Sequence, residues 1–288
     1  MTISEYNKIP AVNFSLLKLY LKSPAHFKWA WDNPQEDADA TKAMIIGKAI
    51  HTLILEPKEF TKRFVTLDES QRPEPTKNYQ NTANREWKSF MLNYYVNQGM
   101  HCLALEDYQM ICSMGAQVVN NKSAKALLAE CEFEEMIEWT DSDTGVKCKA
   151  RLDFSNKKKR IVGDLKSMED ASPYALPGFM AKWGTHVQLA FYSDGLSVIH
   201  GEPYNTQFLI ATEKQAPYCC QSYYLDENAV EQGRLIYKGL LKMHKMCVEK
   251  NEWPGYEYVH QNISGVIVTD IPAYSYSKME NTEFFQKN

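Results

Sequence analysis

The chain has 288 residues, of which 44% are hydrophobic, 12% aromatic and 24% charged, a composition that excludes a largely disordered protein. Its formal net charge of -4 lacks the basic signature of proteins that coat nucleic acid, although a local basic groove can lie on an acidic body. No apolar stretch reaches the roughly 18 to 20 residues of a spanning helix, and the N-terminus lacks signal-peptide character. Because seven cysteines include no C-x-x-C pair, we expect reduced thiols and a cytoplasmic protein without membrane contact.

The first half of the chain carries helical periodicity. Asn13-Phe14-Ser15 is a helix start signal before an apolar run that stops near Ser23-Pro24. Further helices are predicted over 38–55, 79–97 and 104–129, the first of them ending at Glu56-Pro57. The polar, proline-rich segment 68–78 is expected to form a loop or a mobile lid.

From Cys131 the pattern changes to the period of strands, with a turn at 141–145. Residues 146–153 alternate cleanly, with the even positions apolar and Lys149, Arg151 and Asp153 on the other face. The remaining elements are predicted as strands over 160–167, 205–212 and 217–224 and helices over 185–199 and 226–250. We therefore predict a mixed α/β fold, in which a central mixed sheet is flanked by helices and follows a helical N-terminal half.

We expect one domain over residues 1–256. It comprises a helical part (1–130), a sheet core that carries the chemistry (131–225) and a C-terminal helix (226–250). The aromatic tail 257–288 is expected to pack on the body or on a neighbouring subunit.

The triplet Asp164-Leu165-Lys166 is the first candidate for chemistry. In a strand, Asp164 and Lys166 share a face while Leu165 points into the opposite layer. A carboxylate binds a hard divalent cation, and a nearby ammonium can orient water and offset phosphate charge. The turn near 156–159 brings Asp153 roughly opposite Asp164, so that two carboxylates converge. Taken alone the pattern is weak, because aspartates that merely cap strands are common.

A second motif lies downstream, on a predicted helix. Gln188 and Tyr192 are four residues apart and share a face, from which they can hold the DNA backbone or the lysine by hydrogen bonds. Without the preceding strands, a helix with a half-buried tyrosine would be the better interpretation.

These motifs together resemble the PD-(D/E)xK nucleases, and among them the RecE-type exonucleases (exonuclease VIII) of prophages. The resemblance rests on two strands, a histidine helix, a fourth motif and an opening helix: 149–153, 163–167, 47–57, 188–192, and 15–18 with 23–27. It spans about residues 13 to 200. Leu152 stands where the family name has proline, a position that packs rather than reacts.

The resemblance implies a Mg²⁺-dependent 5′-to-3′ exonuclease, with Mn²⁺ as a substitute and no need for ATP. Such an enzyme degrades linear double-stranded DNA from its ends and leaves 3′ overhangs for recombination. A ring-shaped homo-oligomer and a single-strand annealing partner of RecT type are implied in the same way. The implied catalytic residues are Asp153, Asp164, Lys166, Gln188 and Tyr192.

The metal ligands implied by the resemblance are Asp153, Asp164, the Leu165 backbone carbonyl and His51. Ala43, Gly47 and His51 lie at four-residue intervals on one helical face, where small residues would allow close approach to the sheet. A histidine in such a setting is usually a packed core residue. The prediction that His51 binds a metal ion therefore rests on the resemblance.

Residues that contact DNA are predicted less directly. Ser15 and Lys18 are candidates for a terminal 5′-phosphate, and Lys149 and Arg151 share the face of Asp153. A lysine-rich turn, Lys157, Lys158 and Lys159, is a further candidate, although such turns are usually only solvated. Glu134 and Glu135 are candidates for a second metal ion, and the sequence favours neither.

Two other classes remain open. One is an endonuclease or a CRISPR-associated-type nuclease with the same core, although the cysteine spacing argues against an iron–sulfur cluster. The other is a non-catalytic DNA-end-binding subunit, against which the intact Asp153, Asp164 and Lys166 argue. Dependence on a free DNA end would distinguish the exonuclease from the endonuclease. Metal-dependent cleavage would distinguish it from the non-catalytic subunit.

Overall fold

The computed structural model describes residues 3–34 and 41–256 of the chain. The predicted packing of the tail 257–288 lies outside these residues. No helix in the described part is long and apolar enough to cross a membrane.

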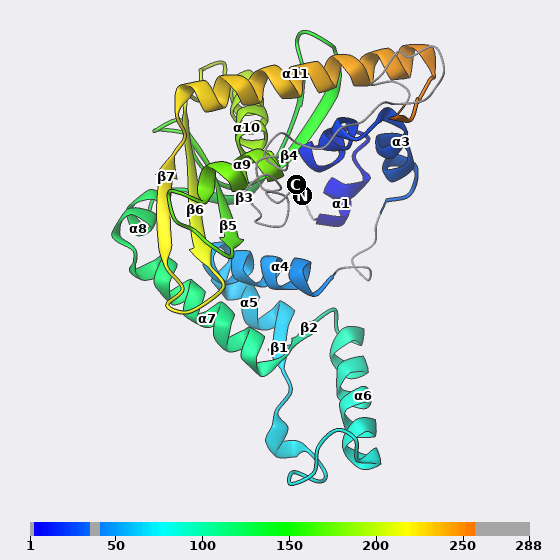
Figure 1. The fold of residues 1–288 in the computed structure, drawn as a ribbon, viewed down its shortest axis with the longest axis vertical. Coiled ribbons are helices and arrows are strands. Elements are labelled where there is room, and N and C mark those ends of the chain that lie inside the picture. Colours follow the sequence, from blue (N-terminus) through cyan, green and yellow to red (C-terminus); the bar gives the residue numbers. More distant parts are fainter. Residues whose placement is uncertain (1–2, 35–40, 257–288) are drawn as a thin grey trace, which may run out of the picture.

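A five-stranded sheet of order β3-β4-β5-β6-β7 forms the centre of the molecule (Figure 1). Neighbouring strands are antiparallel except β5 and β6, which run parallel, so the predicted mixed sheet is confirmed. The strands are β3 (Glu132–Thr140), β4 (Lys147–Asn156), β5 (Ile161–Met168), β6 (Thr206–Glu213) and β7 (Cys220–Tyr224). The last strand starts later than predicted. Tyr218 takes a positive φ of 60°, which is not an extended conformation, so the strand begins after it.

Helices cover both faces of the sheet, as the mixed α/β prediction requires (Figure 1). One face carries α10 (Thr185–His200) and α11 (Glu227–Lys250), and the other carries α4 (Lys42–Leu55), α7 (Leu105–Asn120) and α8 (Lys122–Leu128). Apolar alternation explains the two layers: Leu209 packs with the α10 side, whereas Leu165 and Ile210 pack with Leu55 and Val118 on the other.

Short elements precede and join these layers. They are α1 (Ile3–Lys8), α2 (Phe14–Leu17), the 3₁₀ helix η1 (Lys18–Leu21), α3 (Pro24–Asp32), α5 (Pro57–Arg63) and α9 (Leu176–Trp183). The N-terminal group packs beside the first residues of β4, where Val12 forms a bridge with Cys148. This places the N-terminal segment next to the strand that carries Asp153.

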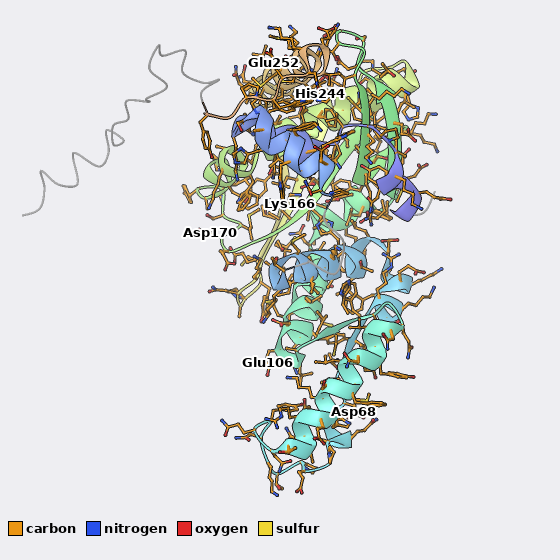
Figure 2. All side chains as sticks on the ribbon, turned by 90° about the vertical axis from the view of Figure 1, so that its right-hand side faces the viewer. Asp68, Glu106, Lys166, Asp170, His244 and Glu252 are labelled. Atoms are coloured by element: carbon orange, nitrogen blue, oxygen red, sulfur yellow. The ribbon has the colours of Figure 1, made fainter. Side chains whose placement is uncertain are left out.

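An arm projects from the α4 side, away from the sheet (Figures 1 and 2). It is built from β1 (Phe64–Thr66), β2 (His101–Leu103), the 3₁₀ helix η3 (Glu69–Gln71) and α6 (Thr82–Asn97), and β1 and β2 pair in parallel. The loop predicted over 68–78 is ordered around the buried Asn84 side chain, whose amide donates to the carbonyls of Glu74, Lys77 and Asn78.

Two predictions of helical boundaries are wrong. The single helix expected over 104–129 is broken at Asn121, whose side chain caps α8 by accepting from the Ala124 amide. The helix expected to start near 38 begins at Lys42, after an N-cap at Thr41 whose hydroxyl accepts from the Met44 amide.

Candidate metal and phosphodiester site

The two aspartates lie where β4 and β5 stop pairing. The backbone ladder runs from Asn156↔Ile161 to Phe154↔Gly163, so the next pair in register is Asp153 and Asp164. Beyond this point β4 continues to pair with β3, and β5 continues to pair with β6, but β4 and β5 no longer pair with each other. The strands therefore separate at the two carboxylates, and the Leu165 amide bridges them by donating to Asp153 Oδ2 at 2.7 Å.

Gly163 is the position that permits this close crossing. A Cβ there would overlap the ring of Phe154, which is fully buried across the ladder. Only glycine leaves room for the ring against the strand directly before Asp164.

Asp164 lies at the centre of a hydrogen-bonded group. Lys166 Nζ is 2.8 Å from Asp164 Oδ1 and 2.7 Å from Oδ2, and Gln188 Nε2 donates to Oδ1 at 3.0 Å. Gln188 also donates to the Tyr192 hydroxyl at 2.9 Å. Gln188, which is predicted to hold the lysine or the DNA backbone, donates to the carboxylate of Asp164 in the structure. Gln188 and Tyr192 therefore fix the rotamer of Asp164 from α10.

His51 reaches the site from α4, on the opposite side of the sheet from α10. Its Nδ1 lies 3.5 Å from Asp153 Oδ1. The expectation that Ala43 and Gly47 allow this helical face to pack tightly is wrong. Ala43 is exposed, and a Cβ on Gly47 would meet nothing within 4 Å, so the small residues leave open space in front of His51.

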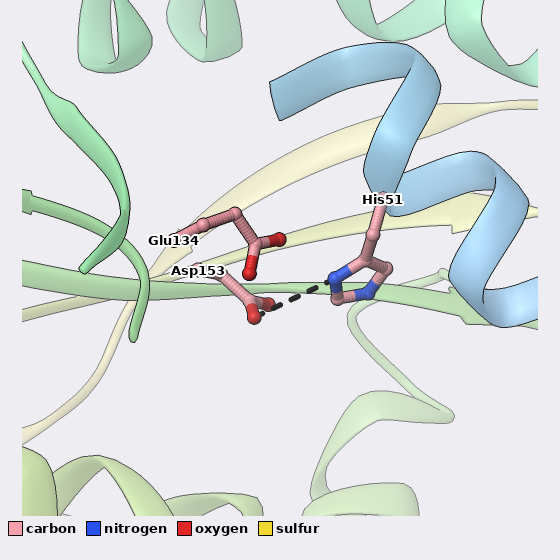
Figure 3. A group of neighbouring side chains, drawn as sticks. All are labelled: His51, Glu134 and Asp153. Carbon is pink, nitrogen blue, oxygen red and sulfur yellow. Dashed lines mark ion pairs between the residues drawn. The ribbon is translucent and has the colours of Figure 1, made fainter. Parts of the chain in front are cut away.

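Glu134, one of the two glutamates considered for a second metal ion, lies beside Asp153. It stands opposite Asp153 in the β3–β4 register, and its φ of 54° is unusual for a residue other than glycine. One ligand atom each from His51, Glu134 and Asp153 lie within 4.8 Å of one another. Figure 3 shows the three side chains pointing toward one another from α4 and the two strands. Glu135 turns the other way, where it accepts from the Ser155 hydroxyl.

The titration behaviour of the group reflects burial among like and unlike charges. Burial, reinforced by the Asp153 charge, raises the pKa of Asp164 to about 6 against the opposing effect of Lys166. Burial likewise raises the pKa of Glu134 to about 7, although Arg151 opposes the shift. For Asp153 burial acts in the same direction, but the His51 and Lys166 charges outweigh it and lower its pKa below the ordinary value. For Lys166, the two carboxylates overcome burial and raise its pKa.

A pocket of about 770 Å³ opens between α4 and the sheet. Its wall includes the cationic side chains Lys48, Arg63, Arg151 and Lys166 and the acidic side chains Glu134 and Asp153. In the described part of this acidic chain, cationic side chains thus outnumber acidic ones along the pocket lining, and Lys166 lies between α4 and the N-terminal helices (Figure 2).

The structure places the residues that are predicted to contact DNA in different surroundings. Ser15 and Arg151 line the pocket, and Lys18 lies within electrostatic reach of Lys166, which together with burial lowers its pKa. The turn 157–159 lies outside the pocket lining, and Lys159 pairs with Glu130 at 2.8 Å.

Lys149 requires a correction. Its side chain is buried, and its ammonium donates to the carbonyls of Tyr6 (2.8 Å), Ile9 (2.9 Å) and Asn7 (3.3 Å). The residue alternates with the apolar face as predicted, but α1 covers the face on which it lies. Lys149 therefore fastens the N-terminal helix and does not face the pocket.

Comparisons with known proteins agree with this geometry. A family model described as a PDDEXK-like domain of unknown function (DUF3799) matches residues 13–262. The chain belongs to this PDDEXK-like family. The matched range contains both aspartates, Lys166 and the Gln188–Tyr192 pair, so the predicted membership of the PD-(D/E)xK nucleases is confirmed. The comparisons do not single out the RecE type within them.

Two solved structures are compared with this chain, and one of them supports the fold. One described as a "putative exonuclease" from Eubacterium rectale has a TM-score of 0.61 at 12% sequence identity, covering 96% of this chain and 97% of that chain. A structure of SSO0001, at 15% identity, covers 69% of this chain and 88% of its own, with a TM-score of 0.28 that is too low to support an inference. Comparison with curated proteins gives no match.

Proposed function

We propose that the protein is a Mg²⁺-dependent exonuclease that degrades linear double-stranded DNA in the 5′-to-3′ direction without ATP. The observation that supports this most is the meeting of Asp153, Asp164 and Lys166 at the point where β4 and β5 separate, within the PDDEXK-like family. Degradation of the strand whose 5′ end lies at the duplex terminus would leave 3′ overhangs for recombination.

The side chains present fit a hard divalent cation. One imidazole nitrogen and two carboxylate oxygens lie within 4.8 Å of one another, and Asp164 follows in the adjacent strand. Oxygen donors with one imidazole suit Mg²⁺ or Mn²⁺. His51, Asp153, Asp164 and the Leu165 carbonyl are the proposed ligands. When bound, the cation supplies Lewis-acid stabilisation of the phosphate and a more acidic water.

The chain's own residues supply positioning and charge. Lys166, which Asp164 holds at 2.7–2.8 Å, is charged at neutral pH and can hydrogen-bond the attacking water or a phosphate oxygen. Gln188, braced by Tyr192, keeps Asp164 in one rotamer. The Leu165 amide keeps Asp153 in place from the other strand. Both carboxylates are therefore pre-organised before the substrate arrives.

Dependence on a free DNA end is the finer part of the proposal. It is supported by the resemblance to RecE-type exonucleases and by the likeness in fold to the E. rectale structure, which is described as a "putative exonuclease". The same core could serve an endonuclease, and a subunit without activity could retain the fold. Cleavage assays on labelled linear DNA and on closed circles separate these alternatives.

Linear duplex labelled at either the 5′ or the 3′ end, incubated with Mg²⁺ and without ATP, tests the proposal. We expect early release of the 5′ label, no cleavage of covalently closed circles, and loss of activity in Asp164→Ala and Lys166→Ala. Exclusive release of the 3′ label refutes the polarity, and cleavage of closed circles favours the endonuclease. Unchanged activity in both variants refutes the site.

The assembly and the biological partner are proposals of the same origin. A ring-shaped homo-oligomer would enclose the DNA and support processive digestion, and a single-strand annealing protein of RecT type would bind the exposed 3′ strand. Light scattering coupled to size exclusion, with and without DNA, tests the first. A monomer at all concentrations would exclude a ring.

A further inference from the structure

We propose that Arg151 is shared between Glu134 and the DNA backbone, so that Glu134 masks the phosphate-binding guanidinium until it turns to a divalent cation at His51 and Asp153. This inference rests on the proposed function, because it assumes that the pocket binds DNA and a cation. It assigns Glu134 and Arg151 a joint role: together they couple cation binding to substrate binding.

Glu134 is placed between two alternative partners. Its carboxylate pairs with Arg151 through Nε, and the same carboxylate lies within 4.8 Å of the ligand atoms of His51 and Asp153. The side chain is only 11% exposed, so water does little to screen either interaction. Because a carboxylate that holds a cation has less negative charge to offer a guanidinium, the two interactions compete.

Arg151 has a second anchor that would keep it at the pocket wall. Its Nη2 lies 3.6 Å from Glu56 Oε2, at the C-terminal end of α4. Glu56 is itself held by both Nη atoms of Arg63, at 2.9 and 3.1 Å. If Glu134 turns away, Arg151 stays oriented by Glu56 while its Nε–H edge becomes available.

The charges of this group give the coupling its direction. When Glu134 is ionised, Glu56, Glu134, Arg63 and Arg151 together are neutral, so this part of the pocket wall attracts phosphate weakly while both ion pairs are formed. Once Glu134 faces a cation, Arg151 retains only its longer contact to Glu56. A guanidinium binds a phosphate through two parallel hydrogen bonds and gains specificity in doing so.

The experiment compares two affinities in four variants. DNA binding is measured by anisotropy of a labelled linear duplex in EDTA, and Mn²⁺ binding is measured by calorimetry without DNA. The variants are Glu134→Gln, Arg151→Gln, the double variant and the matched control Glu135→Gln. The control removes one negative charge from the neighbouring residue, which faces Ser155 and not the pocket.

We expect Glu134→Gln to bind DNA in EDTA about fivefold more tightly than the wild type, since Arg151 is unmasked. The same variant should bind Mn²⁺ about tenfold more weakly. The double variant should lose the gain in DNA affinity, and Glu135→Gln should match the wild type in both assays. Arg151→Gln should bind Mn²⁺ at least as well as the wild type.

The proposal is overturned if Glu134→Gln shows no gain in DNA affinity, or a gain that survives loss of Arg151. Weaker Mn²⁺ binding in Arg151→Gln would also overturn it, and this holds even if Glu134→Gln fails to fold. Cleavage of linear duplex by the wild-type protein is followed in parallel. If the wild type cleaves DNA but the affinities do not change, the inference alone fails. If it does not cleave, the proposed function fails, and the affinities still decide whether Arg151 is shared.

Discussion

The Leu165 backbone amide donates a 2.7 Å hydrogen bond to Asp153 Oδ2, just beyond the last backbone pair that joins β4 and β5. This contact replaces the ladder at the point where the strands separate. It also leaves Asp153 Oδ1 facing His51, at 3.5 Å from Nδ1. Asp153 is thus fixed through one oxygen and presents the other to the pocket.

Replacement of Asp153 by asparagine should lower the single-turnover rate of DNA cleavage by at least about 100-fold, because it removes the charge that a cation requires while preserving the shape. Asp143→Asn is the control, since Asp143 lies in the exposed β3–β4 turn and pairs with Lys238. The control should retain the wild-type rate. A residual rate above about a tenth of wild type in Asp153→Asn would remove this residue from the catalytic set.

Cation affinity should depend on pH through the two carboxyls with raised pKa values. The pKa of Asp164 is about 6 and that of Glu134 about 7, so both must release protons to act as ligands at lower pH. Mn²⁺ affinity should therefore decrease as the pH falls through this range, by up to about tenfold per pH unit for each proton displaced. Calorimetry at several pH values measures both the affinity and the protons released. An affinity independent of pH between about 5 and 8 would contradict the assignment.

The same pKa values predict how the stability of the metal-free protein varies with pH. The folded-state values lie above the ordinary values of 3.8 for Asp164 and 4.5 for Glu134. Each group therefore contributes stability that is complete below its ordinary pKa and is lost as the pH rises through its folded-state value. In EDTA, Asp164→Asn should show a shallower decline in unfolding free energy than the wild type between about pH 4 and pH 7. Urea denaturation measures the decline, and identical slopes would contradict the raised pKa.

Local periodicity was sufficient to predict much of the site. The strand period of two places Asp164 and Lys166 on one face, and the helical period places Gln188 and Tyr192 together. To predict that Glu134 lies at the site, the register of the β3–β4 hairpin must be known. Pairing Thr140 with Lys147 across the turn brings Glu134 opposite Asp153.

Other errors came from contacts between distant parts of the chain. Lys149 lies on the face of β4 that the alternation predicts to be polar, but α1 covers that face. No local pattern reveals a contact across more than 140 residues. The sequence predicts no helix where α5 and α9 lie, because proline usually ends a helix. Each begins with proline at its first or second position, where the missing amide costs nothing.

Lys149→Met should destabilise the fold by about 1–3 kcal/mol, because it leaves the carbonyls at the end of α1 without their charged donor. Its effect on DNA affinity should be small, since the ammonium does not face the pocket. Lys147→Met on the same strand is the control, because the Lys147 side chain is exposed and its loss should leave stability unchanged. A large loss of DNA affinity with unchanged stability in Lys149→Met would restore its predicted role in DNA binding.

Two glycines of α11 provide a test of how the helical layer positions the site. A Cβ at Gly233 would lie 2.5 Å from the His186 carbonyl oxygen in the first turn of α10, whereas a Cβ at Gly239 would meet nothing within 4 Å. Gly239→Ala should therefore stabilise the protein by about 0.5–1 kcal/mol through helix propensity. Gly233→Ala should destabilise it by about 1–3 kcal/mol, because the backbone of α10 must shift.

The shift matters because Gln188 follows His186 by two residues and holds Asp164 at 3.0 Å. Gly233→Ala should therefore also reduce DNA cleavage measured well below its unfolding temperature, whereas Gly239→Ala should not. If Gly233→Ala unfolds more easily but cleaves at the wild-type rate, the contact between α10 and α11 serves stability alone. In that case the shift of the α10 backbone at His186 does not carry to Gln188 and Asp164.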